Sequence, residues 1–419
     1  MDSPKFDAAM QHLDVEFVRS CFPTFQESPG KHIAFFENAG GSYVLGSVLD
    51  RLNHFYRFNK VQPYGESEIG RLAGEQMDAG RNSMIDLLGM PEDTITLGPS
   101  TTQNINTLAL ACAAIVDAGS EVIVSEQDHE ANIGAWERLC QRQGARFRLW
   151  EVNPDTGELS LEDLQSMLNP AVKIVCVTHS SNILGTINPV EEVIELCRAF
   201  DTRVIVDGVS YVPHQLPNLS IFQPDAYVFS TYKTWATHLG VMYCSRDFAE
   251  TLDPQCHYFN RPYREKWLDA AGPDHASIAA LAGLEDYFEA SHQHHIGERN
   301  VSLKKKAGQV SALMHKHEQK LCEQLITGLE KLPIRIIGKN NINWREANVA
   351  LVSKKHSPAE MNKALAQRDI AVGHGHFYAV RLLEKLGIDV NEGVLRISLA
   401  HYNTEEEVER LLDVMKSLH

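Results

Sequence analysis

The sequence predicts an α/β protein with a mainly parallel, seven-stranded sheet in a large domain, followed by a smaller α+β domain. From about residue 94 to residue 244, short apolar runs alternate with stretches of helical periodicity. This pattern is typical of βαβ units and of a parallel sheet covered on both faces. After about residue 285 the pattern changes to a long charged helix followed by short strands. The chain of 419 residues is also longer than a single core usually supports.

Each strand of the large domain is predicted from a short apolar run. The runs cover residues 94–97, 121–125, 146–150, 173–178, 203–207, 226–230 and 240–244. Helical periodicity between them covers 102–116, 131–143 and 190–200. In parallel α/β sheets, ligands bind beyond the carboxyl ends of the strands. We therefore expect the functional residues directly after these strands.

The smaller domain is predicted from the last third of the chain. One helix should cover residues 292–329 and a final helix residues 404–418, with short strands around 335–337, 347–352 and 394–398. The sequence has no internal repeat and no low-complexity tract. We expect an N-terminal segment, 1–34, packed on the small domain, a large domain, 35–285, and a small C-terminal domain, 286–419.

Charge and hydropathy argue against several classes of protein. The formal net charge of −16 disfavours nucleic-acid binding, because proteins that bind the phosphate backbone need a positive surface. The first residues, MDSPKFDAAM, lack the basic and apolar parts of a signal peptide, and the longest apolar run, 108–116, is too short to span a bilayer. We expect a cytoplasmic protein that binds neither nucleic acid nor membranes.

The cysteines predict reduced thiols. No two of them form a CxxC pair, and several lie in apolar strand or helix contexts. This pattern suits neither a disulfide framework nor a zinc site, so we expect no bound metal. The eight cysteines are Cys21, Cys112, Cys140, Cys176, Cys197, Cys244, Cys256 and Cys322.

Asp207 ends the predicted strand in RVIVDG. A carboxylate at the end of a strand that is buried on both faces needs a cationic partner. Asp207 could cap a helix or form a turn before Gly208. It could also keep the pyridine nitrogen of a cofactor protonated, so that the ring withdraws electrons from a developing carbanion.

Lys233 follows the next predicted strand, in FSTYKTWATHLG. An isolated lysine usually forms an exposed salt bridge. A lysine directly beyond an inner strand, among hydroxyl-bearing neighbours, lies in a polar pocket where desolvation lowers its pKa and makes it a competent Schiff-base amine. Asp207 and Lys233 should face one another across a pocket the size of a pyridine ring.

The segment GPSTTQN, residues 98–104, combines a Gly-Pro turn with hydroxyls that open an apolar helix. Backbone N–H groups and hydroxyls at a helix N-terminus bind phosphate, although the same residues also suit a simple helix cap. We expect Thr101, Thr102 and Gln103 to contact the phosphate of a cofactor, with Ser230 as a further hydroxyl.

His129, in SEQDHEAN, also follows a predicted strand and precedes a helix. It could be a capping or surface histidine. Together with Asp207 and Lys233, its flat ring suits a position stacked on the cofactor, from which it could move a proton.

In their order, the segments FFENAGG, GPSTTQN, SEQDHEAN, THSSNILGTINP, VIVDG and FSTYK resemble the class V aminotransferase family of fold-type I enzymes. Within that family, the sequence most resembles the cysteine desulfurase and selenocysteine lyase branch. The resemblance runs from about residue 35 to the end of the chain. It implies pyridoxal 5'-phosphate as cofactor, a small amino acid as substrate, and a homodimer with shared active sites.

The resemblance also implies roles for single residues. Lys233 would be the Schiff-base lysine, Asp207 the partner of the pyridine nitrogen, and His129 the ring that stacks on the cofactor. Asn182 would lie near the phenolic oxygen. The remaining cofactor contacts would be Thr101, Thr102, Gln103, Ser210, Ser230 and Tyr232.

Two residues are expected at the substrate. The segment VLRISLAHYNTEEEV resembles the substrate-binding segment of the family, which makes Arg396 the clamp for the α-carboxylate. Arginine suits this role because it donates two parallel hydrogen bonds to a carboxylate, although an ordinary ion pair at a strand edge is the alternative. Asn38, in FFENAGG, is the second.

Some positions depart from the family pattern. The family usually has Gln at the position of Ser210 and His at that of Tyr232. It usually has Thr in a loop that the partner subunit contributes, roughly where Gly272 and Pro273 stand, so we expect the region 272–275 near the phosphate site of the neighbouring subunit.

The most informative departure is a missing thiol. Desulfurases that form a persulfide carry a cysteine on a mobile loop ahead of the arginine. The corresponding segment, VGHGHFYAV, has Tyr378 or its neighbours and no cysteine. Persulfide chemistry through this loop is not expected, and Cys256 is the only conceivable substitute.

We therefore expect a pyridoxal phosphate-dependent lyase that releases a β-substituent such as sulfur, selenium or sulfinate from a cysteine-like amino acid. Another reaction at the α-carbon is the alternative: transamination, epimerisation or cyclisation. Tyr232, directly before the lysine, makes the sequence similar to kynureninase-like members of the family, so cleavage of a C–C bond is a further alternative. An inactive binding protein is a third alternative, disfavoured by the joint presence of Asp207, Lys233 and Arg396.

Overall fold

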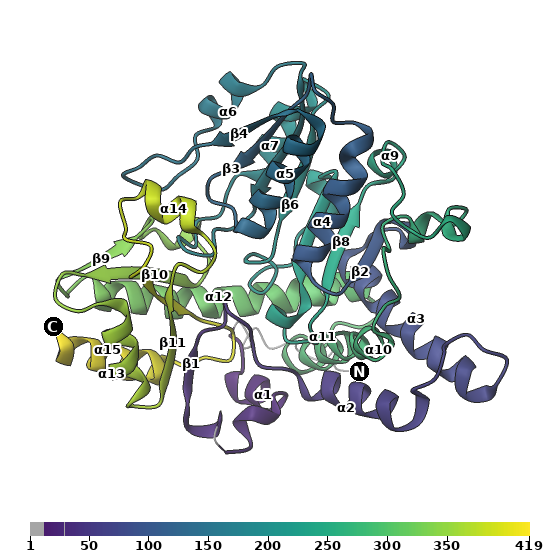
Figure 1. The fold of residues 1–419 in the computed structure, drawn as a ribbon. Helices are drawn as coiled ribbons and strands as arrows, with labels where there is room; N and C mark the ends of the chain where they lie inside the picture. The colour runs from purple at the N-terminus through teal and green to yellow at the C-terminus, as the bar shows by residue number, and fades with distance from the viewer. Residues whose placement is uncertain (1–11, 29) are drawn as a thin grey trace, which may run out of the picture.

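A computed structural model describes residues 12–28 and 30–419 of the chain. Its larger sheet has seven strands in the order β2-β8-β7-β6-β5-β3-β4 (Figure 1). The strands are β2 (Ile95–Gly98), β3 (Glu121–Ser125), β4 (Arg146–Trp150), β5 (Val172–Thr178), β6 (Arg203–Asp207), β7 (Ala226–Ser230) and β8 (Gly240–Cys244). β8 pairs antiparallel with β2 and β7, and the other pairs are parallel. The predicted fold class is confirmed.

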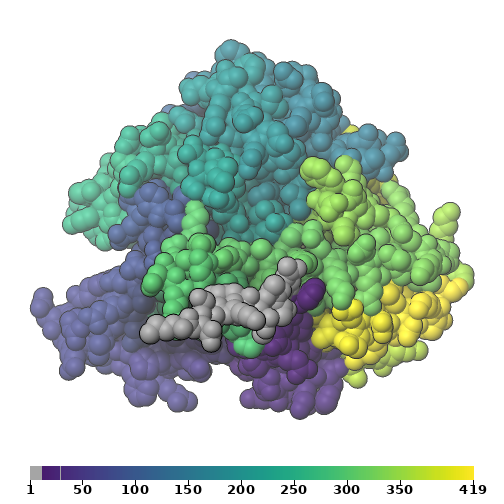
Figure 2. All heavy atoms as spheres, turned by 180° about the vertical axis from the view of Figure 1, so that it is seen from behind, coloured from purple at the N-terminus to yellow at the C-terminus, as the bar shows by residue number. Residues whose placement is uncertain are grey.

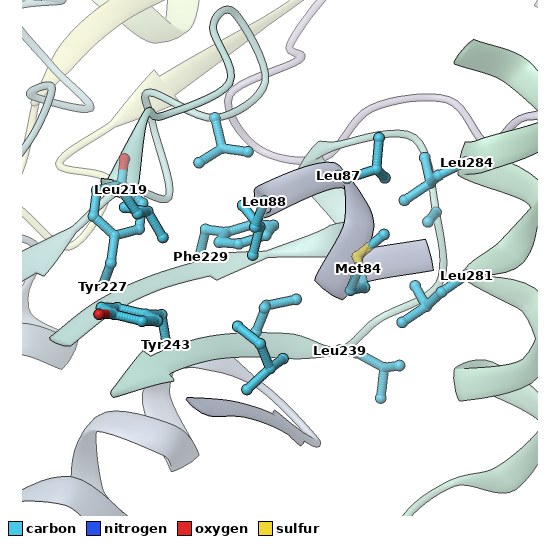
Figure 3. Close-up of a cluster of buried hydrophobic side chains, with 14 of the residues drawn as sticks. Met84, Leu87, Leu88, Leu219, Tyr227, Phe229, Leu239, Tyr243, Leu281 and Leu284 are labelled. Atoms are coloured by element: carbon cyan, nitrogen blue, oxygen red, sulfur yellow. The ribbon is translucent and has the colours of Figure 1, made fainter. Parts of the chain in front are cut away.

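Helices cover both faces of this sheet. They are α3 (Glu68–Leu88), α4 (Thr101–Ala111), α5 (Glu130–Gln143), α7 (Val190–Arg198), α10 (His275–Ala280) and α11 (Ala282–His295). On one face, α4 and α5 bury a cluster that includes Ile205 and Val228. On the other face, α3, α7, α10 and α11 pack over Val206 and Phe229, and Figure 3 shows Leu88 of α3 beside Phe229. Because both faces are covered, the strands are nearly continuous apolar runs.

The second sheet has five strands in the order β1-β11-β12-β10-β9. They are β1 (Ala34–Phe36), β9 (Ile334–Ile337), β10 (Asn348–Ser353), β11 (Ile370–Gly375) and β12 (Val394–Ser398). β1 pairs parallel with β11, and the other pairs are antiparallel. The sequence analysis did not predict β1 or β11. After β1, which belongs to the second sheet, the chain continues to β2 of the first sheet. The domain boundaries predicted at residues 34 and 285 stay a prediction.

The predicted continuous helix over 292–329 is wrong. The chain forms α11, which ends at His295, and a separate α12 (Leu303–Leu329). Gly297 and Asn300 between them adopt left-handed φ angles of 71° and 59°, which interrupt a helix. The side chain of Ser302 then caps the first turn of α12 by accepting a hydrogen bond from Lys305 N.

α12 joins the two halves of the molecule. It packs against α3 and α11 at the first sheet and against α15 (Glu405–Leu418) at the second. The C-terminal part of α12, α13 (Pro358–Ala366) and α15 cover one face of the five-stranded sheet. The shorter helices of the chain are α2 (Gly46–His54), α6 (Leu161–Met167), α8 (Leu219–Phe222), α9 (Arg246–Ala249) and α14 (Val380–Lys385).

The described part of the N-terminal segment, which begins at residue 12, lies beside the C-terminal helices (Figures 1 and 2). Arg19 of α1 (Val15–Ser20) forms a salt bridge of 2.9 Å with Glu407 of α15. Phe17 stacks on His294 of α11, with ring centroids 4.0 Å apart. The packing predicted for residues 1–11 lies outside the described residues. Among the described helices, none has the length and hydropathy needed to cross a membrane.

Candidate active site

A cavity of about 270 Å³ lies at the carboxyl ends of the strands of the large sheet. Several of its lining residues come shortly after a strand in the sequence: Ser100 follows β2, His129 follows β3 and Lys233 follows β7. Because these strand ends meet at one edge of the sheet, residues far apart in the sequence share one cavity. The predicted site residues that line it are Thr101, Thr102, His129, Asn182, Asp207, Ser210, Ser230, Tyr232 and Lys233.

Lys233 ends a short turn after β7 and is only 8% exposed. Burial and the charge of Arg396 lower the pKa of Lys233 to about 7, although Asp207 acts to raise it. Part of the amine is therefore neutral at physiological pH. A neutral, buried amine is the form that attacks a carbonyl carbon.

Asp207 ends β6 and is buried. One carboxylate oxygen accepts a hydrogen bond of 2.9 Å from Val209 N. Burial raises the pKa of Asp207 to about 6, against the lowering effects of this hydrogen bond and of the charge of Lys233. Within the described part of the chain, no basic side chain lies within 4.0 Å of the carboxylate. The site therefore holds a buried acid that lacks a direct cationic partner.

His129 caps α5 and lines the cavity. Its Nδ1 accepts a hydrogen bond of 3.0 Å from Ala131 N. Burial, followed by the charges of Lys233 and Arg396, lowers the pKa of His129 to about 4. The ring is therefore neutral at physiological pH, and its hydrogen is on Nε2 because Nδ1 is an acceptor. His129 therefore caps α5 and lines the cavity, and its role at a cofactor stays a prediction.

The N-terminus of α4 opens on the same cavity. Ser100 caps this 11-residue helix by accepting a hydrogen bond of 3.1 Å from Gln103 N. The hydroxyl oxygens of Thr101 and Ser230 lie 2.7 Å apart. Gly240 of β8 allows the backbone of Thr101 to lie close to this strand, because a Cβ at position 240 would lie 2.5 Å from Thr101 N. Free backbone N–H groups and hydroxyls at a helix N-terminus form an anion site.

Asn182 connects the cavity to the second sheet. Its Nδ2 donates a hydrogen bond of 2.9 Å to Phe377 O, and its backbone oxygen accepts one of 3.3 Å from Arg396 Nη1. Asn182 Oδ1 is buried and has no partner among the described residues. Arg396, in β12, is 2% exposed and does not line the cavity itself. Burial lowers the pKa of its guanidinium to about 10 despite the raising effect of Glu37.

Two predicted site residues lie outside the main cavity. Gln103 is exposed and lines a neighbouring cavity of about 170 Å³ together with Gly272 and Pro273. Asn38 lines a small pocket next to Lys233. Its Nδ2 donates a hydrogen bond of 2.8 Å to the backbone oxygen of Ser398. The roles given to Gln103 and Asn38 stay predictions.

The sequence analysis missed a histidine that lines the cavity and an aspartate that supports its lining. His238 lines it, and its ring stacks on Tyr232 at a centroid distance of 4.6 Å and an angle of 5°. This histidine stands in the motif FSTYKTWATHLG and could have been noticed there. Asp128, directly before His129, is buried and accepts hydrogen bonds from Asn132 Nδ2 at 2.7 Å and Thr178 N at 3.0 Å. It holds the turn that presents His129.

No cysteine lines the main cavity. All eight cysteines are unpaired. Cys256, the one substitute considered for the missing thiol, is half-buried in the segment after α9. Within the described residues, no group of three or more His, Cys, Asp or Glu side chains is arranged to hold a metal ion.

Comparison with known families shows which family the chain belongs to. A family model described as Aminotransferase class-V matches residues 34–411. The chain belongs to the class V aminotransferase family. The resemblance predicted from the motifs is therefore confirmed, and enzymes of this family depend on pyridoxal phosphate.

Curated relatives of the chain are cysteine desulfurases. A cysteine desulfurase of Escherichia coli O9:H4 (strain HS) is 28% identical over 428 residues, which cover 97% of this chain and 98% of the relative. A probable cysteine desulfurase of Mycolicibacterium paratuberculosis is 28% identical over 429 residues, which cover 99% of this chain. The chain spans only 60% of the length of that second relative.

Solved structures confirm the fold. The apo structure of a cysteine desulfurase from Thermococcus onnurineus NA1 has a TM-score of 0.85 at 23% identity and covers 96% of this chain and 97% of that chain. An Escherichia coli cysteine desulfurase has a TM-score of 0.81 at 21% identity and covers 97% and 98%. At these identities, the likeness shows the architecture alone.

The residues of the cavity fit pyridoxal phosphate. Asp207 is a buried acid without a direct cationic partner, which suits a protonated pyridine nitrogen. The N-terminus of α4 suits a phosphate, and Lys233 is a buried amine. The unpartnered amide oxygen of Asn182 also requires a polar group in this cavity.

Proposed function

We propose that this chain is a pyridoxal 5'-phosphate-dependent lyase that releases a β-substituent, such as sulfur, selenium or sulfinate, from a cysteine-like amino acid without using a protein thiol. One observation carries the proposal. Lys233, Asp207 and the hydroxyls at the N-terminus of α4 line a single cavity that no cysteine lines.

The residues of the cavity divide into three groups of cofactor contacts. When bound, pyridoxal phosphate supplies an electron sink that makes the α-proton and the β-substituent of an amino acid labile. Lys233 would hold its carbonyl carbon, and Asp207 would keep its pyridine nitrogen protonated. Thr101, Thr102 and Ser230 would hold its phosphate, with His238 as a neighbour that the sequence did not predict.

The same residues supply proton transfer and orientation. With a pKa of about 7, Lys233 can accept and return the α-proton of the substrate near physiological pH. The neutral ring of His129 would cover the face of the cofactor and exclude water. Arg396 would bind the α-carboxylate, because within the described residues no carboxylate lies within 4.0 Å of its buried guanidinium.

The missing thiol restricts the leaving group. The relatives named above are cysteine desulfurases, but the segment between β11 and α14 of this chain is His376-Phe377-Tyr378-Ala379. A substituent that departs as a stable small molecule, such as sulfur dioxide from cysteine sulfinate, which water then converts to sulfite, needs no acceptor on the protein. Substrates of this kind fit the site better than sulfur transfer through a persulfide.

A product screen tests this proposal. Purified holoenzyme would be incubated with L-cysteine, L-cysteine sulfinate, L-selenocysteine and β-chloro-L-alanine, and alanine, pyruvate, sulfide, sulfite and selenium would be measured. We expect release of the β-substituent from at least one of them, at a rate that thiol alkylation leaves unchanged. Formation of a keto acid that retains the β-substituent, or only of the D-isomer, would favour transamination or epimerisation instead.

The proposal includes a homodimer in the cytoplasm. Large apolar side chains are exposed on two segments, 56–72 and 258–263, which both lie on the right-hand side of Figure 1. They include Tyr56, Phe58, Tyr64, Tyr258, Phe259 and Tyr263. An interface at these segments would bury them. The resemblance to the family further implies that the region 272–275 lies near the phosphate site of the neighbouring subunit. Sedimentation at assay concentration should show a dimer, and a fully active monomer would contradict this assignment.

A further inference from the structure

An aromatic ring covers the guanidinium of Arg396. The Cζ atom of Arg396 lies 3.7 Å from the centroid of the Phe377 ring. Arg396 is 2% exposed, and its Nε has no hydrogen-bond partner among the described residues. A buried cation normally requires an anionic partner. The face of an aromatic ring is only a partial replacement, since it attracts a cation through its quadrupole and accepts no charge-assisted hydrogen bond.

The backbone that places this ring is strained. Phe377 and Tyr378 have φ angles of 48° and 58°, and neither is glycine. Bulky residues are rare in this left-handed region, because their side chains strain the backbone there. Two consecutive residues of this kind persist only where neighbouring contacts hold them. A segment in this state can change conformation when those contacts are replaced.

Two hydrogen bonds from other parts of the chain hold the backbone of this segment. Asn182 Nδ2 and Glu130 N donate hydrogen bonds of 2.9 Å to the backbone oxygens of Phe377 and Tyr378. The ring of Phe377 packs on Gly373, which is paired in register with Arg396 across β11 and β12. A Cβ at Gly373 would lie 2.9 Å from this ring. The Tyr378 side chain is 65% exposed, and its ring lies beside that of His129, with ring centroids 5.0 Å apart.

We propose that Phe377 is a displaceable cover on Arg396, which the α-carboxylate of the incoming amino acid replaces. This inference rests on the proposed role of Arg396 as the carboxylate clamp. The ring shields the guanidinium while no substrate is bound. When a carboxylate binds, the ring leaves and the strained segment 376–378 relaxes.

Asn182 would communicate this change to the cofactor side of the cavity. Its side chain lines the cavity and holds Phe377 O, while its backbone oxygen accepts from Arg396. Removal of Phe377 from Arg396 would therefore release the amide of Asn182. Phe377 is thus a residue that determines specificity, because only ligands with a carboxylate can displace it.

Calorimetric titration of the holoenzyme with L-alanine tests the cover. L-alanine carries the α-carboxylate but no leaving group, and L-alaninamide is the matched ligand without the carboxylate. A desolvated cation–π contact is strong enough to change an equilibrium by about tenfold. We expect Phe377→Ala to lower the Kd for L-alanine by about tenfold and to leave that for L-alaninamide unchanged.

The variants Arg396→Ala and Arg396→Ala/Phe377→Ala complete a double-mutant cycle. Arg396→Ala should weaken L-alanine binding, and Phe377→Ala should have no further effect in that background. Gly373→Ala keeps the Phe377 ring but places a methyl group where the ring packs. This variant should therefore also lower the Kd for L-alanine. It keeps the test available if Phe377→Ala fails to fold.

The failure of this inference differs from the failure of the proposed function. If Arg396→Ala weakens L-alanine binding but neither Phe377→Ala nor Gly373→Ala strengthens it, the cover is refuted and the role of Arg396 stands. If Phe377→Ala strengthens binding equally with and without Arg396, the cover is also refuted. If Arg396→Ala leaves L-alanine binding unchanged, the assignment of Arg396 fails and the cover fails with it.

Discussion

Replacing Asp207 by asparagine should weaken cofactor binding and, at the same time, stabilise the protein without its cofactor. The amide keeps an oxygen that can accept the 2.9 Å hydrogen bond from Val209 N, but it removes the negative charge. A buried cation left without its counter-charge costs about 3–5 kcal/mol. Cofactor affinity or turnover should therefore fall by at least about 100-fold.

The opposite effect on the apoprotein follows from the pKa of Asp207. Burial raises it from an ordinary value of 3.8 to about 6, so the folded protein binds this proton more tightly than the unfolded chain. Ionised Asp207 therefore destabilises the fold, fully above pH 6 and not at all below about pH 4. The difference between the two pKa values corresponds to about 3 kcal/mol, which Asp207→Asn should recover in the apoprotein at pH 8.

Two measurements and one control variant decide this prediction. Cofactor affinity is measured by visible absorbance during titration, and apoprotein stability by urea unfolding at pH 8 and pH 4. Asp225→Asn is the control, because Asp225 is paired with Arg203 at 3.1 Å and does not line the main cavity. It should leave cofactor affinity unchanged. If Asp207→Asn bound the cofactor as tightly as the unchanged protein, another group would protonate the ring and the assignment of Asp207 would be wrong.

Further variants test other parts of the site. Lys233→Ala should abolish the visible band and turnover, and normal turnover in this variant would refute the proposed function. Arg396→Ala should keep the band of the holoenzyme but lower kcat/KM by an amount equivalent to about 2–4 kcal/mol, since charge-assisted hydrogen bonds and orientation are lost; an unchanged kcat/KM would contradict the clamp. Cys256→Ser should keep full activity, and mass spectrometry of trapped turnover should find no persulfide; a persulfide on Cys256 with loss of activity would restore a desulfurase mechanism. Burial acts to lower the pKa of His214, but Glu318, 2.6 Å away, raises it to about 9. This pair should therefore stabilise the fold fully below pH 6.5 and lose its effect as the pH rises through 9. If the unfolding free energy of a Glu318→Gln variant decreased over this pH range as much as that of the unchanged protein, this prediction would be wrong.

The strands and the residues after them were predictable from the sequence. Asp207 and Lys233 each directly follow an apolar run, and the geometry of a parallel sheet brings such positions to one edge. The hydroxyls after β2 were predictable for the same reason. In each case a local pattern determines the element, and the topology of the sheet determines the position.

Contacts between distant segments were not predictable in this way. β1 exists only because it pairs with β11, more than three hundred residues later. The ring of Phe377 covers Arg396 through two left-handed backbone angles that no residue type at these positions indicates. The end of α11 is different, because Gly297 and the capping Ser302 marked the break in the sequence.

Reduction of the holoenzyme with borohydride, followed by peptide mass spectrometry, tests the central claim most directly. Borohydride fixes pyridoxal phosphate covalently to the lysine that holds it. We predict one modified peptide, which contains Lys233, and no modified peptide in the Lys233→Arg variant. A protein that takes up no cofactor, or one whose modification lies on another lysine, would contradict the account.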